Sequence, residues 1–444
     1  MRKKRKLKKI VKIIFGIIGL CLLVSFVVLL VLNLPKDDNK EKVKETINYT
    51  NLIMKLDNNT FDKSFLLWVE DNYGTGILSE LYSCLNDNTY DVSFWHKFTG
   101  NSYIVLNDLY FNMYENRNDL TYVNQDMEYI SIGFAGDVSL ADNWAIMPKY
   151  VARQNGVYGI VSENMVGYMK SLDWMNINSE FAFSSRGKAM SGKQYTFRAT
   201  PSNVSVYDEM GVDMVALANN HVYDYGQDAF YDTLSTLKNV NIPYIGAGAN
   251  KSEAESAYYL VINGYKISFL NATRAEKYIM TPEAGENSPG VFRCYDTTRL
   301  VERIKEEKEI SDYVVVIVHW GKETYHTLEQ VQIDTGKVYI DSGADMVVGH
   351  HAHVLQGMEF YKGKLIAYNL GNFIFNSQTV DTGILKWELD DDGNSKYYFY
   401  PGLQSNCYTK EVTGQDALNL YSKMTNWSIN ANFLEDGQIV ERTN

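Results

Sequence analysis

Five short apolar runs between residues 129 and 351 constrain the fold of this chain more than any other feature. Each run stops at a polar side chain, and the runs are 129–136, 212–217, 265–270, 313–318 and 346–348. Runs of this length and composition are typical of β-strands, and the most continuous ones predict strands buried on both faces. Helical patterns at 227–240 and 297–309 lie between them. The alternation predicts a layered α/β architecture.

The polar residues that end these runs predict where a site would form. Four of them lie at or just past the end of a run: Asp137, Asn220, His319 and His351. Ligands of open α/β sheets bind at the carboxyl ends of strands, so several loops are expected to converge on one site. The same region contains no nucleotide-binding phosphate loop, nucleophile elbow or dinucleotide fingerprint.

Histidine is concentrated in the same stretch. Six of the seven histidines fall within residues 221–353, namely His221, His319, His326, His350, His351 and His353. Imidazole and carboxylate ligands together suit divalent first-row metals such as Mn, Fe or Zn. Two adjacent metals can clamp a phosphoryl group and lower the pKa of a bound water. The sequence therefore predicts a divalent metal centre, with two ions expected and their identity open.

The N-terminus combines a basic segment with a long apolar one. Eight Lys and Arg residues lie within residues 2–12, and an uncharged apolar run of 20 residues extends from Ile13 to Leu32. A helix of about 20 residues crosses the hydrocarbon core of a bilayer, and a basic flank stays cytoplasmic. We expect 1–12 to be a cytoplasmic tail and 13–32 a single-pass transmembrane helix in the cell membrane. A cleavable signal peptide is the alternative, but its apolar segment would be shorter and would end at small residues.

The remainder of the chain is expected to be extracytoplasmic. The 42 basic residues, less the eight before Leu32, leave 34 against 54 acidic residues, a formal charge of −20. Such a surface argues against a nucleic-acid partner. Three scattered cysteines, Cys84, Cys294 and Cys407, are too few to staple a domain of this size, so burial must hold the core together.

We divide the extracytoplasmic part into three regions. Residues 33–128 are expected to form a linker and a small, mainly helical region, and 129–376 the α/β domain. Residues 377–444 are expected to be a C-terminal extension that packs on that domain.

Six ordered motifs in residues 129–376 resemble those of the CapA family of capsule (poly-γ-glutamate) biosynthesis proteins, which belong to the calcineurin-like metallophosphoesterase superfamily. The motifs are Gly136-Asp137, Asn178-x-Glu180, Asn219-Asn220-His221-x-x-Asp224, His319-Trp320-Gly321-x-Glu323, His350-His351-x-His353 and Leu370-Gly371-Asn372-Phe373. The resemblance implies a four-layer α/β sandwich of the metallophosphoesterase type. It leaves residues 35–128 and the chain after Asn376 unexplained.

The resemblance also implies a role for each motif residue. Asp137 and His353 would bind the first metal, and Glu180 would take the bridging-carboxylate position. The second metal would be held by Asn220, His319 and His351. His221 would protonate the leaving group or stabilise the transition state, and Asp224 would orient His221.

Four more residues are candidates for substrate contact: Asn178, Arg198, Glu323 and Asn372. An internal salt bridge is the alternative for Arg198. We expect His350 to pack beside the metal ligands, His326 to be a surface loop residue, and Trp320 to pack or to line the cleft.

One departure concerns the first motif. The superfamily has Asp-x-His there, whereas this chain reads Asp137-Val138-Ser139, so the first metal site lacks a ligand unless another residue replaces it.

Three functions fit these observations. The first is a membrane-anchored, metal-dependent hydrolase of capsule or surface-polymer biosynthesis that acts on a phosphoester or a similar bond. The second is a non-catalytic factor that binds an acidic polymer and a membrane-bound polymer synthase. The third is a surface phosphatase or nucleotidase unrelated to a capsule.

Overall fold

The computed structural model describes residues 63–115, 117–123, 127–276 and 281–442. The chain divides into two compact units, 1–91 and 92–444. The predicted transmembrane helix at 13–32 lies outside the described residues. Among the helices that are described, none is both long and apolar enough to cross a membrane.

The described part of the first unit is a pair of helices, α4 (Lys63–Tyr73) and α5 (Ile77–Asn86). α5 buries Leu78, Leu81 and Leu85, which lie on one face because they are three or four residues apart. This pair agrees with the helical character predicted for the region.

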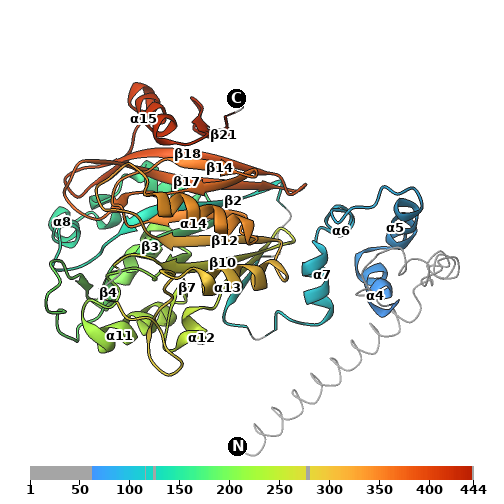
Figure 1. The fold of residues 1–444 in the computed structure, drawn as a ribbon, viewed down its shortest axis with the longest axis horizontal. Helices are drawn as coiled ribbons and strands as arrows, with labels where there is room; N and C mark the ends of the chain where they lie inside the picture. Colours follow the sequence, from blue (N-terminus) through green and yellow to red (C-terminus); the bar gives the residue numbers. More distant parts are fainter. Residues whose placement is uncertain (1–62, 116, 124–126, 277–280, 443–444) are drawn as a thin grey trace, which may run out of the picture. The chain divides into compact units, whose positions relative to one another are not determined.

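The second unit is built on two large β-sheets (Figure 1). The seven-stranded sheet has the order β1 (Leu120–Val123), β9 (Tyr258–Ile262), β10 (Tyr265–Thr273), β12 (Tyr313–His319), β13 (Met346–His350), β15 (Lys364–Ala367) and β14 (Met358–Tyr361). The ten-stranded sheet runs β20 (Ala431–Phe433), β21 (Gln438–Glu441), β18 (Ser395–Gln404), β17 (Val380–Asp390), β2 (Tyr129–Val138), β3 (Trp174–Ser179), β6 (Met214–Ala216) and β7 (Tyr244–Ile245), with β16 (Asn372–Ile374) on β2 and β19 (Thr409–Glu411) on β18.

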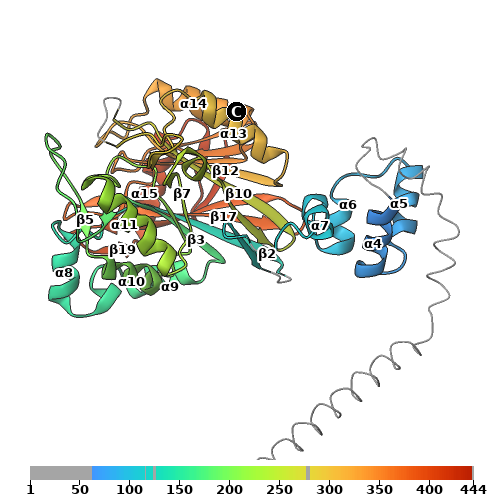
Figure 2. The same cartoon turned by 90° about the horizontal axis from the view of Figure 1, so that it is seen from below.

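Helices pack around the two sheets. The helices are α6 (Phe94–Thr99), α7 (Tyr103–Tyr110), α8 (Ile146–Arg153), α9 (Glu163–Lys170), α10 (Ser205–Met210), α11 (Gly226–Asn239), α12 (Lys251–Ala254), α13 (Thr298–Lys308), α14 (Gln330–Asp341) and α15 (Gly414–Trp427). Of these helices, α9, α10, α11, α13 and α14 cover the outer faces of the sheets. Figure 2 shows α13 and α14 on one side of the strands, and α9 and α10 on the other.

Three hydrophobic cores separate the layers. One core joins α13 and α14 to β12 and β13, and a second joins α9, α10 and α11 to β2, β3 and β6. The third lies between the two sheets and contains Phe134, Phe269 and Ile317. The unit is therefore an α/β domain with a helix–sheet–sheet–helix arrangement. The runs predicted at 265–270, 313–318 and 346–348 are strands β10, β12 and β13, and the predicted helices are α11 and α13.

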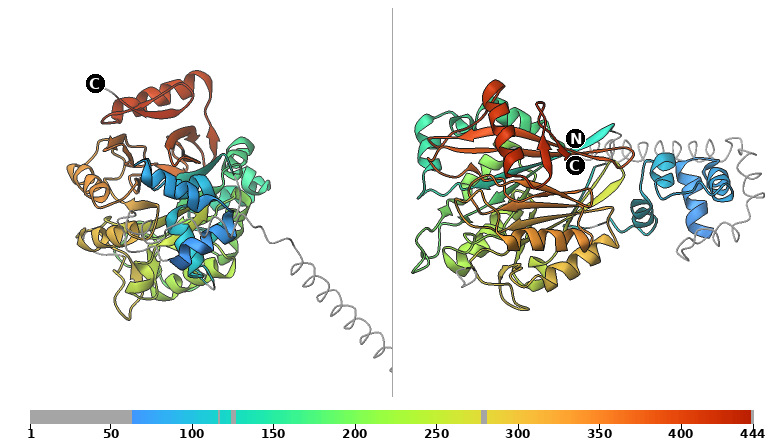
Figure 3. Two further views of the ribbon diagram at one scale, coloured as in Figure 1. Left: turned by 90° about the vertical axis from the view of Figure 1, so that its right-hand side faces the viewer. Right: turned by 45° about the horizontal axis from the view of Figure 1, so that its top comes forward.

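Residues beyond 376 belong to the sheet itself. The hairpin β17–β18 pairs with β2 over the whole of Tyr129–Ala135, and α15 contributes Leu420, Tyr421 and Met424 to the core between the sheets (Figure 3). The predicted boundary at 376 therefore falls within the ten-stranded sheet. The strands of the hairpin have alternating burial, which leaves them a weaker apolar signal than β12 or β13.

The start of the second unit also precedes the predicted boundary at 129. α6 and α7 lie against the amino ends of β10 and β12, where His96 Nε2 is 2.8 Å from the Asn263 carbonyl oxygen and Ser102 Oγ donates to Asp312 Oδ2 over 2.7 Å. β1 pairs with β9 as a parallel edge strand. Residues 92–123 are therefore part of the α/β unit.

Candidate metal centre

The candidate site lies at the carboxyl ends of strands from both sheets. Parallel pairing aligns the ends of β2, β3 and β6, and in the other sheet it aligns the ends of β12 and β13. The side chains that follow these ends are the predicted ones: Asp137, Glu180, Asn220, His319, His351 and His353. The structure therefore brings together every residue for which a metal-binding role was predicted.

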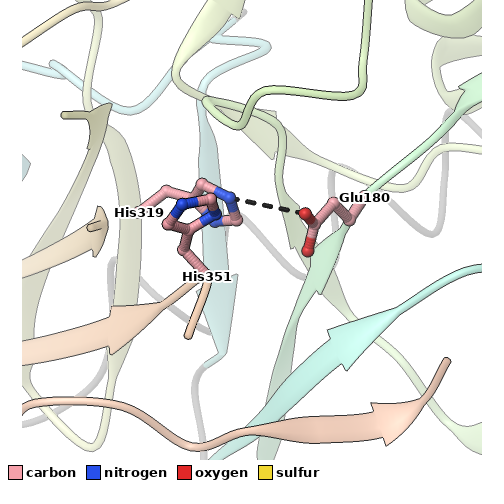
Figure 4. Close-up of side chains that lie close together, drawn as sticks. All are labelled: Glu180, His319 and His351. Carbon is pink, nitrogen blue, oxygen red and sulfur yellow. Dashed lines mark ion pairs between the residues drawn. The ribbon is translucent and has the colours of Figure 1, made fainter. Parts of the chain in front are cut away.

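Two groups of three side chains could each hold a metal ion. One consists of Glu180, His319 and His351, and the other of Asp137, Glu180 and His353. In each group the ligand atoms lie within 4.8 Å of one another. Figure 4 shows the first group, in which His319 Nε2 is 3.5 Å from Glu180 Oε1. Glu180 belongs to both groups, as its predicted bridging role requires; the role itself stays a prediction.

Asn220 lies beside the first group, which contains Glu180, His319 and His351. Its Oδ1 lies 2.9 Å from His319 Nε2, and its amide donates to Glu276 Oε1 over 3.2 Å. An amide oxygen is an acceptable ligand for Mn or Fe beside two imidazoles.

The carboxylates of the site are deeply buried. Burial raises the pKa of Glu180 well above its ordinary value, and the neighbouring charge of Asp137 adds to this effect. Burial also opposes ionisation of Asp137, yet contacts from His350 and His353 hold the pKa of Asp137 well below its usual range. Cations would reverse the penalty on Glu180, since a bound metal stabilises the ionised carboxylate.

The histidines are poised to act as neutral ligands. Burial lowers the pKa of His351 to about 3 and that of His319 well below its ordinary value. Burial also opposes the protonation of His353, but its contact with Asp137 raises the pKa of His353. Metal binding needs unprotonated imidazole, so the environments of His319 and His351 suit that role.

Two atoms of the candidate ligands have no hydrogen-bond partner within the described part of the chain. These atoms are Glu180 Oε1 and His351 Nδ1. Buried polar atoms are normally satisfied, so a cluster of unsatisfied ones is the expected state of ligands seen without their ion. The donor set therefore fits a divalent metal centre.

Two of these ligands also have an unusual backbone. His351 has φ of +95° and His353 has φ of +57°. Such values are costly for residues with a Cβ atom and are concentrated at functional sites. The turn that follows β13 thus points both rings of the His-x-His motif into the site.

Gly136 and Gly371 explain how β2 and β16 approach each other at Asp137. A Cβ atom on Gly136 would lie 1.9 Å from the carbonyl oxygen of Gly371, the atom that accepts the Asp137 amide at 2.8 Å. Gly371 itself has φ of +66°. The glycines of both motifs are therefore required for the position of Asp137.

The environment of Asn178 corrects its predicted role in substrate contact. Its Nδ2 donates to Asp137 Oδ1 at 2.8 Å and to Glu180 Oε2 at 3.2 Å, while its Oδ1 accepts from Asn219 Nδ2. The side chain is buried and both ends are engaged within the protein. Asn178 therefore holds the two carboxylates apart.

Asn372 contacts a predicted metal ligand. It is fully buried, and its Oδ1 lies 2.8 Å from His353 Nδ1. A hydrogen bond to the second ring nitrogen fixes the tautomer and orientation of a metal-binding histidine. Its Nδ2 has no hydrogen-bond partner among the described residues, and its substrate contact stays a prediction.

Among the described residues, Arg198 does not form the internal salt bridge considered as its alternative role, and its substrate contact stays a prediction. Its Nη1 donates to the carbonyl oxygens of Arg186 and Gly187, and its guanidinium lies 4.3 Å from the centre of the Tyr225 ring. No carboxylate of the described residues forms an ion pair with it. Arg198 therefore braces the loop that begins at Ser184.

Glu323 is exposed in the loop after β12, close enough for its charge to raise the pKa of His353. Its substrate contact stays a prediction.

His221 and Asp224 form a closely coupled pair beside the metal ligands. His221 Nδ1 is 2.7 Å from Asp224 Oδ2, and His221 Nε2 is 4.0 Å from Glu180 Oε1. Burial lowers the pKa of His221 and the charge of Asp224 opposes that effect. Because a carboxylate accepts, the proton on Nδ1 points to Asp224 and Nε2 faces the candidate metal ligands.

The remaining motif residues lie as follows. His350 Nδ1 is 3.5 Å from Asp137 Oδ1, which places His350 behind a predicted ligand as expected. His326 lies in an exposed loop, where its ring stacks on Trp427. Trp320 is fully buried and packs between Tyr339 and Tyr368.

Ser139 occupies the place of the histidine in the superfamily's Asp-x-His motif. It is fully buried, and its Oγ has no hydrogen-bond partner among the described residues. A hydroxyl is a weaker metal ligand than imidazole. The departure noted in the sequence thus lies within the site.

Lys193 and Glu276 are site residues that the sequence did not point to. Lys193 Nζ lies 2.7 Å from Asp224 Oδ1 and 3.8 Å from Glu276 Oε2. Lys193 comes from a polar, glycine-containing loop, and Glu276 from a loop after β10. Neither stands in a motif or at a strand end, so only the folded chain places them here.

The sequence of this chain is similar to those of several known proteins. The family described as bacterial capsule synthesis protein PGA_cap matches residues 131–377. The capsule biosynthesis protein CapA of Bacillus anthracis is 28% identical over 314 residues, which span 68% of this chain and 74% of that protein. The PGA biosynthesis protein CapA of Bacillus subtilis (strain 168) is 28% identical over 324 residues, spanning 70% and 82%. A probable polyglutamine synthesis accessory protein, Rv0574c of Mycobacterium tuberculosis, is 28% identical over 207 residues, spanning 45% and 54%.

Proposed function

This chain belongs to the bacterial capsule synthesis protein family PGA_cap, whose members are related to the metallophosphoesterases, and on this premise we propose that it is a metal-dependent hydrolase of surface-polymer biosynthesis. In this proposal, residues 13–32 anchor the protein in the membrane. The α/β domain is of the metallophosphoesterase type and is extracytoplasmic. The polymer is poly-γ-glutamate or a related acidic capsule polymer, and a membrane-bound synthase is the proposed partner.

The observation that carries the proposal is that Glu180 belongs to both groups of candidate metal ligands. Two three-residue groups share this carboxylate, and each group also contains one or two histidines. A buried carboxylate between two clusters of neutral and anionic ligands is the arrangement expected for a pair of divalent ions. Mn, Fe or Zn would fit the oxygen and nitrogen donors.

The chemistry divides between the ions and the chain. Bound divalent ions would supply Lewis acidity and make a water molecule a nucleophile near neutral pH. Asn178 keeps Asp137 and Glu180 in position, and Asn372 orients His353. His221 directs Nε2 at the site. This nitrogen would take up the proton released by the attacking water, and His221, as the imidazolium form that Asp224 stabilises, would pass that proton to the leaving group.

Metal content of the full-length chain tests the proposal. We expect close to two Mn, Fe or Zn ions per chain in the wild type. Asp137→Ala and His351→Ala should each reduce the content, and Glu180→Gln should reduce it most because both groups use Glu180. Wild-type chain that stays metal-free after incubation with each ion would contradict the proposal. Turnover of a phosphodiester probe that is unchanged in the Glu180→Gln variant would contradict the hydrolytic part.

Ser139 favours a second candidate function. Where the superfamily has a histidine ligand, this chain has a buried hydroxyl, and a weakened first metal site would suit a protein that binds polymer and synthase without hydrolysis. Co-purification with the synthase would then be equal for wild type and His351→Ala. Loss of polymer synthesis in cells carrying His351→Ala, with co-purification intact, would favour the hydrolase.

The topology needs its own test. A periplasm-active phosphatase reporter fused after Asn444 should be active only if the C-terminus is extracytoplasmic. Removal of residues 13–32 should release the protein from the membrane fraction. A reporter that is inactive in cells would contradict the proposed orientation.

A further inference from the structure

The loop between β4 (Ala182–Phe183) and β5 (Arg198–Ala199) sends one lysine into the site. Residues 185–189 of this loop are exposed, as are Ser191 and Gly192. The side chain of Lys193 is only 6% exposed, although it belongs to the same loop. Most lysines keep their ammonium group in water, so a buried one must be compensated by specific partners.

The partners of Lys193 all lie next to the proposed metal ligands. Its Nζ forms an ion pair of 2.7 Å with Asp224 Oδ1, donates to the carbonyl oxygen of Asn220, and lies 3.8 Å from Glu276 Oε2. Asp224 is itself buried, with 1% of its side chain exposed. Lys193 thus contacts the segment that carries both Asn220 and His221.

Asp224 divides its two oxygens between different tasks. Oδ2 is 2.7 Å from His221 Nδ1 and also accepts the backbone amide of Phe197 at 2.7 Å. Oδ1 faces Lys193 and has no other close partner in the described chain. A carboxylate held at both oxygens cannot rotate, and its orientation decides which nitrogen of His221 carries the proton.

We propose that Lys193 is a positioning residue for His221: it fixes Asp224 so that the imidazole keeps its proton on Nδ1 and directs Nε2 at the proposed metal ligands. The same ammonium group ties the Asn220 carbonyl to the exposed loop. The effect of Lys193 on catalysis rests on the proposed function. The contacts among Lys193, Asp224 and His221 do not depend on it.

The alternative is that Lys193 is a loop staple, a residue that only fixes the loop to the domain and does not affect His221. NMR spectroscopy distinguishes these two roles. The full-length, metal-free chain would be labelled with 15N at histidine only, and the low-field proton resonance of His221 Nδ1 would be assigned by its loss in His221→Gln. We expect this resonance in the wild type and in Lys193→Arg. It should be lost in Lys193→Met and in Lys193→Gln, which serves if the Met variant does not fold.

Controls come from the same loop and from distant histidines. Lys188→Met removes an exposed lysine from the loop, and it should leave the His221 resonance unchanged. The signals of His96 and His326 report whether the fold is intact. A His221 resonance that persists unchanged in Lys193→Met would overturn the proposal and leave Lys193 as a staple.

Kinetics provides the second readout. With Mn²⁺ and bis(p-nitrophenyl) phosphate as the probe, we expect kcat of Lys193→Met to fall about 10- to 100-fold with little change in KM. Lys193→Arg should recover part of the loss. An equal fall in Lys188→Met, or a KM effect alone, would contradict the inference. Absence of turnover in the wild type would count against the proposed hydrolase, and the resonance would still decide the role of Lys193.

Discussion

The two ends of the sheets both bury charged groups, but they do so in opposite ways. At the amino ends, Lys266 forms a 2.7 Å ion pair with Asp108, and His96 stacks on Tyr265 while bonding to the Asn263 carbonyl. At the carboxyl ends, Glu180 and His351 have buried atoms without hydrogen-bond partners in the described residues. Buried polar atoms that have hydrogen-bond partners are characteristic of residues with a structural role. A cluster of buried polar atoms without partners is characteristic of a ligand site. The comparison of these groups thus favours a structural role for Lys266 and His96 and a binding role for Glu180 and His351.

The largest effect should come from breaking the ion pair at the amino ends. Lys266 has 3% of its side chain exposed, so Lys266→Met would leave Asp108 charged and partly buried without its partner. We expect the free energy of unfolding to fall by about 3 to 5 kcal/mol, measured by urea denaturation. Lys410→Met, at an exposed position, is the control and should change stability little. A loss below about 1 kcal/mol at Lys266 would remove the contrast between the two ends.

Stability at the carboxyl ends should depend instead on metal. Free Mn²⁺ at about 100-fold above its dissociation constant should stabilise the wild type by about 3 kcal/mol. Glu180→Gln should abolish this gain, yet its metal-free form should be at least as stable as the metal-free wild type, because an amide avoids the cost of ionising a buried carboxyl beside Asp137. Thermal unfolding with and without Mn²⁺ measures both. A metal-free Glu180→Gln variant that unfolds readily would show a structural carboxylate and contradict the assignment.

A smaller effect should follow from a change behind the ligands. His350 Nδ1 approaches Asp137 Oδ1 at 3.5 Å, so His350→Phe keeps the ring volume and removes the contact. We expect the affinity for Mn²⁺ to fall about tenfold, which corresponds to about 1.4 kcal/mol, as measured by calorimetric titration. His326→Phe, in the exposed loop, should keep the wild-type affinity. Equal affinities for the two variants would mean that Asp137 does not need His350.

The same contrast explains what could be predicted from sequence. Strands β12 and β13 are buried on nearly every residue, so their apolar runs predicted them directly. The hairpin β17–β18 was missed because its strands alternate between buried and partly exposed residues, although Asp391-Asp392-Gly393-Asn394 is a recognisable turn between them. Burial on both faces leaves a stronger trace in sequence than burial on one.

The candidate ligands were predictable for a topological reason. Parallel strands of one sheet end at one edge, so residues at the ends of the neighbouring strands β12 and β13 were expected to lie close together. The packing of the two sheets then brings them to Asp137 of β2. The roles of Asn178 and Asn372 were not predictable, because an amide can face a ligand or hold a neighbouring side chain, and only the folded contacts distinguish these cases. Lys193 was missed since its partners lie about 30 residues or more away in sequence.

The smallest predicted effect concerns pH at the amino ends. Burial raises the pKa of Asp312 to about 6, opposed by hydrogen bonds from the Lys266 amide and Ser102. The native state therefore holds the proton more tightly than the unfolded state, whose aspartate titrates near pH 4. Stability from this proton is complete below about pH 4 and is lost as the pH rises through about 6.

The variant Asp312→Asn keeps acceptors for the Lys266 amide and Ser102 but cannot titrate. Between pH 5 and pH 6 we expect the wild type to lose about 1 kcal/mol more stability than this variant, measured by urea denaturation at each pH. Asp392→Asn, in an exposed turn, should follow the wild type. Parallel profiles for wild type and Asp312→Asn would mean that the amino ends keep a buried carboxylate ionised through hydrogen bonds alone. Buried atoms without hydrogen-bond partners, and not buried charge alone, would then distinguish the metal centre from the amino ends of the sheets.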